Sequence, residues 1–352
     1  MMAHNNKEKV CILGSGNWGT TAARILANNV KSLDNIDKTI NMYVYEELID
    51  GKKLTEIINT QHENVKYLPG FKIPENVIAV PDVVEAVKDA NLIVIVMPHQ
   101  FVKSVLETIK PHIIPSKTKV LSLIKGVVIT PKGTVTVSNL IKENLGIHDV
   151  SVLSGANIAN EIADEQFCES TIGYQVEESA KLWQLLFETP NFRLNCINDV
   201  IGVELCGALK NVVAIAAGFV DGLKLGNNSK AAIIRIGLVE MRKIAPYFSD
   251  SVKGITFLES CGVADLITTC YGGRNRKLAE LFVTTGKSMQ ELEKIHLNGQ
   301  KLQGYLTAQE VYEFMVERGI VDEFPLFTKI YKICYEGENV ASIFCDLKVS
   351  LL

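Results

Sequence analysis

Short apolar runs alternate with helical patterns along the first 154 residues of the chain. The runs cover residues 10–13, 40–45, 92–96, 120–124 and 152–154. This alternation is typical of a doubly wound parallel sheet, in which crossover helices connect successive strands. The run at 92–96 is apolar at every position, which favours a central strand covered on both faces.

The segments between these runs contain helix signals. Asp82, followed three residues later by Glu85, resembles a capping box that opens a crossover helix, and residues 99–109 predict a helix that ends before Pro111. Residues 52–70 are polar, and we expect an irregular insertion there. The pattern predicts a Rossmann-type α/β domain over residues 1–197.

After about residue 195 the strand signals nearly vanish. Helical periodicity runs through residues 199–222, 229–247 and 274–284. Two further capping-box patterns begin at Ser288 and at Thr307. We therefore expect an all-helical second domain over residues 198–352, which is reasonable because 352 residues exceed the usual size of one hydrophobic core.

Charge and composition narrow the class of protein. The net charge is −4, without a basic block that could neutralise a row of phosphates, so nucleic acid is not an expected partner. The longest apolar run, residues 205–220, is broken by Lys210 and Asn211, and the first nine residues lack a signal-peptide core. Eight cysteines without CxxC spacing indicate buried thiols in a reducing compartment. We expect a cytoplasmic protein without a membrane span or a metal site.

A glycine-rich loop follows the first strand. Its residues are Gly14, Ser15, Gly16, Asn17, Trp18 and Gly19. In a dinucleotide-binding loop the first glycine allows the tight turn, the second lets the backbone approach the pyrophosphate, and the third lets the helix pack on the strand. A GxGxxG motif alone can be a purely structural strand-to-helix turn. Since this one lies between a predicted strand and a predicted helix, it favours a dinucleotide site.

The end of the second strand bears on the choice of cofactor. Residues 45–47 read Tyr-Glu-Glu, and a carboxylate at this place binds the ribose hydroxyl of NAD. No arginine follows directly to receive a 2′-phosphate, which favours NAD, whereas Lys52 and Lys53 leave NADP open as the alternative.

Candidate catalytic groups lie in both halves. Lys125 follows the fourth apolar run, where ligands bind at the carboxyl ends of strands, although an ordinary surface lysine is the alternative. Lys210 lies in a strongly apolar helical segment, with Asn211 beside it. Desolvation lowers the pKa of a buried lysine toward the range in which it exchanges a proton with an alcohol. The alternative is a lysine whose charged end reaches solvent at a domain boundary.

Residues 265–277 combine a carboxylate, hydroxyls, a Gly-Gly turn and a basic helix start. Backbone N–H groups at such a start, together with Arg274, would suit a phosphate dianion, although a structural loop with a solvated basic helix is the alternative. Residues 298–304 form a polar loop that could close over a ligand.

Seven motifs together resemble one known family. They are residues 14–19, 98–101, 122–126, 155–159, 207–213, 270–275 and 298–304. In order and spacing they resemble the NAD-dependent glycerol-3-phosphate dehydrogenases of the soluble eukaryotic type. The resemblance extends from about Val10 to Ala308.

This resemblance implies reversible reduction of dihydroxyacetone phosphate by NADH to sn-glycerol 3-phosphate, in a homodimer. It implies Lys210 as general acid and base, supported by Lys125, Asn211 and Asp265. Lys125 would also contact substrate, and the phosphate would be bound by Arg274 and Asn275, with Thr269 alongside. The implied NAD contacts are Gly14, Ser15, Gly16, Asn17, Trp18, Gly19, Tyr45, Phe101, Ala159, Arg274, Lys301 and Gln303.

Two other functions fit parts of the sequence. A dehydrogenase of the β-hydroxyacid or 6-phosphogluconate type also uses a lysine and an asparagine on a helix, but acts on carboxylates. A non-catalytic NADH-sensing protein would keep only the cofactor site. The joint presence of Lys125, Lys210, Asp265 and Arg274 argues against a sensor, which needs none of them.

Overall fold

The computed structural model describes residues 7–130, 133–297 and 301–347, with side chains for all of them except 127–130 and 133–134. Contacts divide the chain into two compact units. The first consists of Met1–Ile124, Val137–Leu153 and Asn157–Val200. The second consists of Lys125–Thr136, Ser154–Ala156 and Ile201–Leu352.

The first unit is built on an eight-stranded sheet in the order β12-β11-β10-β7-β6-β1-β2-β5. The pairs β1–β2, β1–β6, β2–β5, β6–β7, β7–β10 and β11–β12 are parallel. The strands are β1 (Val10–Leu13), β2 (Ile40–Tyr43), β5 (Val77–Val80), β6 (Leu92–Ile95), β7 (Lys119–Ser122), β10 (Val150–Gly155), β11 (Cys168–Gly173) and β12 (Phe192–Ile197). All four residues of β6 are buried inside the sheet, as its apolar run predicts.

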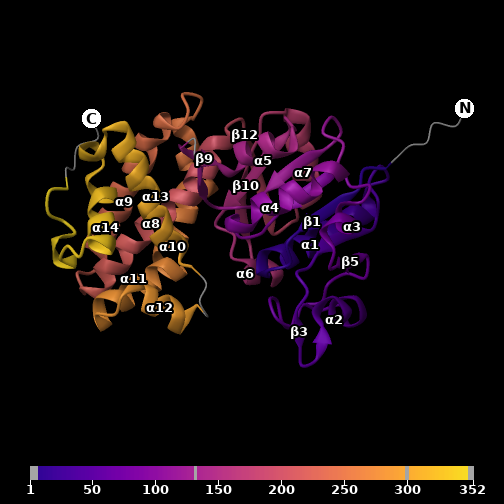
Figure 1. Cartoon of the computed structure of the whole chain (residues 1–352), viewed down its shortest axis with the longest axis horizontal. Coiled ribbons are helices and arrows are strands. Elements are labelled where there is room, and N and C mark those ends of the chain that lie inside the picture. The colour runs from indigo at the N-terminus through magenta and orange to yellow at the C-terminus, as the bar shows by residue number, and fades with distance from the viewer. Residues whose placement is uncertain (1–6, 131–132, 298–300, 348–352) are drawn as a thin grey trace, which may run out of the picture. The chain divides into compact units, whose positions relative to one another are not determined.

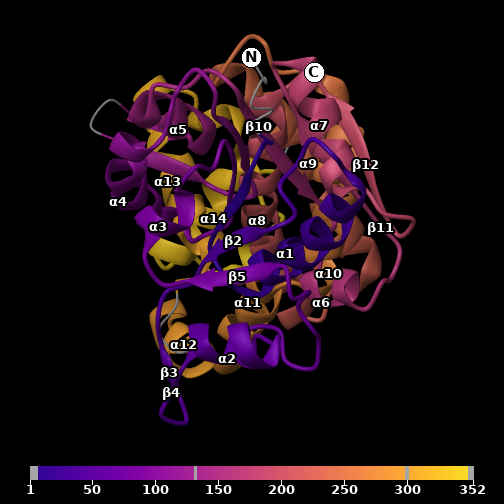
Figure 2. The same ribbon diagram turned by 90° about the vertical axis from the view of Figure 1, so that its right-hand side faces the viewer.

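Helices pack against this sheet in two groups, and the unit can be followed from indigo to magenta in Figure 1 and Figure 2. Helix α1 contacts α6 and α7, while α4 contacts α3 and α5. The helices are α1 (Asn17–Asn29), α3 (Val83–Val87), α4 (His99–Ile109), α5 (Val137–Leu145), α6 (Ala159–Ala163) and α7 (Glu177–Phe187). Apolar side chains of β1, α1 and α7, including Ile12, Leu26 and Trp183, form the core between strands and helices. The predicted Rossmann-type domain is confirmed.

The Asp82 carboxylate accepts hydrogen bonds from the backbone of Val84 and Glu85, which confirms Asp82 as the N-cap of α3, the first half of the predicted capping box.

The insertion at 52–70 is more regular than the sequence analysis expects. It contains β4 (Lys52–Lys53), which pairs antiparallel with β3 (Leu48–Ile49), and α2 (Leu54–Gln61). Leu54, Ile57 and Ile58 are buried on one face of α2. Their spacing of three and four residues is helical, but polar neighbours hide it in so short an element. The expectation of an irregular segment is wrong for this part.

The second unit is mainly helical, and its last helices run from orange to yellow in Figure 1. It contains α8 (Val200–Gly222), α9 (Asn227–Ile244), α10 (Asp265–Gly272), α11 (Arg274–Thr285), α12 (Met289–His296), α13 (Gln303–Arg318) and α14 (Pro325–Tyr335). Ser288 forms the predicted capping box with Glu291 at the start of α12. The pattern that begins at Thr307 instead lies inside α13, which starts four residues earlier, so that prediction is wrong.

Two segments that the sequence analysis assigned to the first domain pack with the second unit. Strands β8 (Val127–Thr130) and β9 (Gly133–Thr136) form an antiparallel hairpin that contacts α13. Lys125, just before the hairpin, forms an ion pair with Asp265 of α10. The described residues of the segments 125–136 and 154–156 therefore belong to the second unit, whereas the predicted first domain extends to residue 197.

Helix α8 is long, apolar and buried. In the described part of the chain it is the helix whose length and composition would allow it to cross a membrane, but 94% of its apolar window is buried inside the fold. A core helix of a globular unit has this character. Lys210 and Asn211 therefore lie on a buried helix, at 5% and 7% exposure.

Candidate active site

The loop after β1 has the geometry that its three glycines predict. Gly14 has a φ of +123°, and a Cβ there would lie 2.3 Å from the Val96 carbonyl oxygen. A Cβ on Gly19 would lie 2.2 Å from the Gly14 carbonyl oxygen, so α1 approaches the strand only because Gly19 has no side chain. A Cβ on Gly16 would meet nothing within 4 Å. The loop is open where a pyrophosphate must approach it.

The other loop residues have partners within the first unit. The Asn17 amide donates to Asn160 Oδ1 at 2.5 Å. The Trp18 ring packs edge-on against Phe192, with ring centroids 6.0 Å apart. The backbone N–H groups at the start of α1 remain available to an anion, because intrahelical partners for the first turn do not exist.

The carboxylates after β2 are engaged in the first unit. Glu46 accepts from Thr55 Oγ1 at 2.6 Å, and Glu47 accepts from Tyr67 at 2.6 Å and pairs with Lys66. Tyr45 is 73% exposed. A ribose contact by residues 45–47 stays a prediction, and either carboxylate would have to share its existing hydrogen bonds with the ligand.

Two more predicted NAD contacts lie in the first unit. The ring of Phe101, in the first turn of α4, is exposed. Ala159 begins α6, and its carbonyl oxygen accepts a hydrogen bond from Thr21 Oγ1 at 3.2 Å.

The second unit brings four predicted catalytic or substrate residues together. Lys210 Nζ, on α8, forms an ion pair with Asp265 Oδ1 and donates to Thr269 Oγ1 at 2.8 Å. Lys125 Nζ lies 2.9 Å from the other carboxylate oxygen, Asp265 Oδ2, and 3.0 Å from the Gly155 carbonyl oxygen. Asp265 is 3% exposed. Two cations thus share one buried carboxylate.

This environment sets the protonation of Lys210. Burial lowers the pKa of Lys210 from 10.5 to about 8, while Asp265 opposes that shift and Lys125 adds to it. A lysine of this kind is protonated at neutral pH yet can release its proton to a nearby oxygen. These are the requirements of a general acid that also acts as a general base in the reverse direction.

Gly207, one turn before Lys210, makes room for Lys125. A Cβ at residue 207 would lie 3.0 Å from Ser154 Oγ and 3.3 Å from Lys125 Cγ. A side chain there would press on Lys125 and move its amine relative to Asp265. Gly207 lies in one of the seven motifs, but its role beside Lys125 could not be predicted from the sequence.

Asn211 and Asn275 form a second contact beside α8. Asn275 Nδ2 donates to Asn211 Oδ1 at 3.0 Å, and Asn275 Oδ1 accepts from the backbone N–H of Gly304 at 2.8 Å. Asn275 is buried and holds the start of α13. Arg274, the first residue of α11, is exposed, and no hydrogen bond or ion pair within the described residues holds its guanidinium. It is free to bind an anion.

The last two predicted NAD contacts lie near the start of α13. Lys301 Nζ lies 3.1 Å from Glu293 Oε2, and Gln303 Nε2 lies 3.4 Å from Thr307 Oγ1. Residues 298–300 of the predicted loop fall outside the described residues.

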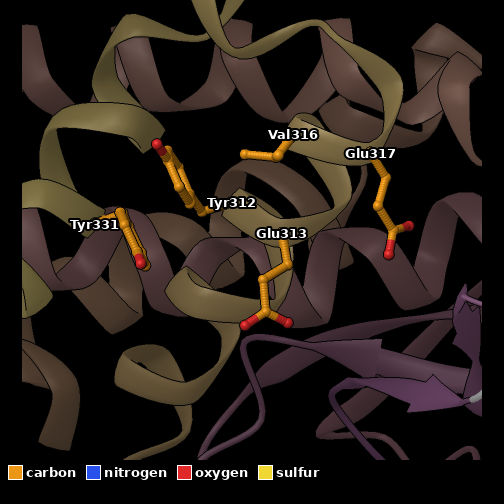
Figure 3. A pocket seen from close by; sticks show the side chains of 5 residues that line it. All are labelled: Tyr312, Glu313, Val316, Glu317 and Tyr331. Carbon is orange, nitrogen blue, oxygen red and sulfur yellow. The ribbon is translucent and has the colours of Figure 1, made fainter.

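A pocket of about 380 Å³ lies apart from these residues, on α13 and α14. Figure 3 shows its lining of Tyr312, Glu313, Val316, Glu317 and Tyr331, with the two tyrosine rings stacked 3.7 Å apart. It contains no predicted site residue. Within residues 7–130, 133–297 and 301–347, no group of three or more His, Cys, Asp or Glu side chains could hold a metal ion.

Comparison with known families gives two matches. Residues 9–180 match the model of the N-terminus of NAD-dependent glycerol-3-phosphate dehydrogenase, and residues 199–345 match the model of its C-terminus. Together the matches cover most of the chain, and the second begins close to Ile201, where the long continuous part of the second unit starts.

Individual relatives cover nearly the whole chain. The glycerol-3-phosphate dehydrogenase 1-like protein of Danio rerio is 56% identical over 342 residues, which are 97% of each chain. The cytoplasmic NAD+ glycerol-3-phosphate dehydrogenase of Homo sapiens is 57% identical over 334 residues, 95% of each chain.

Solved structures of similar proteins share the fold. Glycerol-3-phosphate dehydrogenase of Plasmodium falciparum has a TM-score of 0.93 at 40% identity, over 98% of this chain and 97% of that one. The Saccharomyces cerevisiae enzyme has a TM-score of 0.89 at 44% identity, over 96% and 98%.

Proposed function

The chain belongs to the family of NAD-dependent glycerol-3-phosphate dehydrogenases, and we propose that it reversibly reduces dihydroxyacetone phosphate with NADH to sn-glycerol 3-phosphate. The observation that carries this proposal is the buried cluster in which Lys210 and Lys125 share Asp265. A cofactor-binding protein without turnover has no use for a buried lysine and a second lysine on one buried carboxylate.

The first unit fits the cofactor of the family. The open backbone at Gly16 and the start of α1 suit the pyrophosphate of NAD. When bound, NAD supplies or accepts the hydride. We retain Tyr45, Phe101 and Ala159 as contacts from the first unit. From the second unit we retain Arg274, Lys301 and Gln303, and these assignments rest on the family resemblance.

Lys210 supplies the proton of the reduction. As C2 of the ketone becomes tetrahedral, its oxygen gains negative charge, and the Lys210 ammonium donates a proton to it. In the oxidation direction the neutral amine takes the hydroxyl proton. The pKa of about 8 suits both directions near neutral pH, because either form is accessible at small cost.

Asp265 and Lys125 support this proton transfer. Asp265 orients the Lys210 amine and, with Thr269, fixes where its proton points. Lys125 adds positive charge beside the oxygen that becomes negative, where a water-poor site strengthens the interaction. We place Asn211 beside the substrate, but its amide already donates to the Gly207 carbonyl oxygen at 3.2 Å, so one N–H remains for a ligand.

Arg274 and Asn275 bind the phosphate in this proposal. The guanidinium of Arg274, which has no hydrogen bond or ion pair among the residues that the structure describes, can contact a phosphate through two parallel hydrogen bonds. The backbone at the start of α11 adds N–H groups. Binding of this remote group would align the carbonyl with Lys210. Thr269 remains in the predicted substrate set, although its hydroxyl is committed to Lys210 in this structure.

We also propose a cytoplasmic homodimer. Relatives at 56% and 57% identity carry the word cytoplasmic in their names, which supports the location. The dimer follows from the resemblance.

A substrate panel tests the proposed reaction. NADH oxidation is measured with dihydroxyacetone phosphate and with its unphosphorylated analogue, and NAD+ reduction with 3-hydroxy acids and 6-phosphogluconate. We expect turnover with dihydroxyacetone phosphate and a large loss of kcat/KM without the phosphate. Preferential oxidation of a hydroxy acid would show a β-hydroxyacid-type enzyme, and NADH binding without turnover on any substrate would show a sensor.

A further inference from the structure

A fully buried asparagine lies against the glycine-rich loop in the first unit. Asn64 is 0% exposed. Its Nδ2 donates to the Ser15 carbonyl oxygen at 2.8 Å and to Thr20 Oγ1 at 2.9 Å. Its Oδ1 accepts from the backbone N–H of Tyr67 at 3.1 Å. Both protons and the oxygen of this amide are used, so no other side chain of similar size can replace it.

The segment around Asn64 is built to hold it there. Helix α2 ends at Gln61, and its C-cap residue His62 has a left-handed φ of 52°, which turns the chain away from the helix. Glu63 accepts from the Gly70 backbone at 2.9 Å and pairs with Lys72, which closes residues 63–72 into a loop. A buried polar side chain with every hydrogen bond made is a rigid contact.

The Ser15 carbonyl is the group that Asn64 holds. It also accepts from Thr20 Oγ1 at 3.1 Å, so two donors keep it turned into the protein. A trans peptide is planar, and its C=O and N–H point in opposite directions. The Gly16 N–H, on the same peptide as the Ser15 carbonyl, must therefore point outward. No hydrogen bond within the described residues uses that N–H.

Gly16 is also the position where the loop has room for a ligand, since a Cβ there would meet nothing within 4 Å. We propose that Asn64 is a positioning residue of the dinucleotide site: by holding the Ser15 carbonyl inward, it directs the Gly16 N–H at the cofactor pyrophosphate. This inference rests on the proposed NAD site and deepens it, because it names what fixes the loop in its binding conformation.

The test compares Asn64→Asp with Asn76→Asp. The first exchange keeps the shape of the side chain but replaces both N–H donors by an acceptor that repels the Ser15 carbonyl. Asn76 is a matched control, since its Nδ2 also donates two hydrogen bonds, in this case to the backbone carbonyls of Ala27 at 2.9 Å and Lys38 at 2.6 Å. Those carbonyls lie outside the glycine-rich loop.

Binding of ADP-ribose is measured by calorimetry and binding of adenosine, which lacks the pyrophosphate, by ligand-observed NMR. We expect Asn64→Asp to weaken ADP-ribose about tenfold or more, as for one hydrogen bond left without its partner, and to leave adenosine unchanged. KM for NADH should rise while kcat at saturating NADH stays near that of the wild type. Asn76→Asp should change neither affinity.

Three results would overturn the inference. The first is an unchanged affinity of Asn64→Asp for ADP-ribose. The second is a loss of adenosine affinity in this variant as large as its loss of ADP-ribose affinity. The third is a loss of ADP-ribose affinity in Asn76→Asp as large as that in Asn64→Asp. If Asn64→Asp does not fold, Thr20→Val decides instead, because it removes the hydroxyl shared by Asn64 and the Ser15 carbonyl, and it should weaken ADP-ribose but not adenosine. A wild-type chain that fails to bind ADP-ribose would overturn the proposed NAD site as well, whereas the variant results bear on Asn64 alone.

Discussion

Replacing Asp265 by asparagine keeps the shape of the side chain but removes the negative charge that Lys210 and Lys125 share. At an effective dielectric constant of about 20, opposite charges about 4 Å apart attract by about 4 kcal/mol, or about three pKa units. Because the lysines can move after the exchange, the loss is smaller, and we expect the pKa of Lys210 to fall by about two units. Since the pKa of Lys210 is about 8 with Asp265 present, the variant should hold much less ammonium at neutral pH.

The assay is the pH profile of kcat/KM for dihydroxyacetone phosphate reduction. Reduction needs the ammonium form, so wild-type activity should fall as pH rises through about 8. In Asp265→Asn the midpoint should move toward acid by about two pH units, and activity at pH 7 should drop about tenfold from protonation alone. Oxidation needs the neutral amine, so its activity should rise with pH, and the midpoint of that rise should also move toward acid in the variant.

Asp221→Asn is the matched control. Asp221 also places one carboxylate between two cations, Lys230 at 2.7 Å and Arg276 at 2.5 Å. This exchange should lower the free energy of unfolding but leave the pH midpoint in place. A profile for Asp265→Asn that superimposes on the wild-type profile, or one that moves equally in Asp221→Asn, would refute the assigned role of Asp265.

Three other predictions follow from the site. Arg274→Ala should raise KM for dihydroxyacetone phosphate about tenfold or more, because the phosphate loses a charged, two-point contact, and an unchanged KM would remove Arg274 as the anchor. NADH should give a higher kcat/KM than NADPH in parallel assays, since no arginine follows β2; the reverse preference would contradict the reading of residues 45–47. Gly19→Ala should weaken NADH binding, measured by fluorescence titration, because the new Cβ would lie 2.2 Å from the Gly14 carbonyl oxygen, and wild-type affinity would show that the loop tolerates it.

The order of elements in the first unit could be predicted because parallel strands are buried on both faces and read as continuous apolar runs. Helix α2 could not, since its buried face consists of few residues among many polar ones. Thr307 shows the opposite error: its pattern fits a capping box, but α13 has already begun at Gln303. A cap requires a non-helical residue before the helix, and a short motif does not show this.

The sequence predicted Lys210, Lys125 and Asp265 as site residues, but it did not show that both lysines pair with the one carboxylate. The sequence of α8 alone places no charged residue near Lys210, because its partner Asp265 lies 55 residues away on another helix. Asn64 was not identified at all: a buried amide looks like any polar loop residue until its partners are known. Long-range hydrogen bonds of this kind leave no periodic signal.

The central claim is most directly tested by the rate of dihydroxyacetone phosphate-dependent NADH oxidation, measured side by side for the wild-type chain and Lys210→Ala. We predict steady turnover for the wild type and a kcat lower by about 10²- to 10⁴-fold for the variant, with NADH affinity retained. No dependence of NADH oxidation on dihydroxyacetone phosphate in the wild type, or equal kcat in both proteins, would contradict the account.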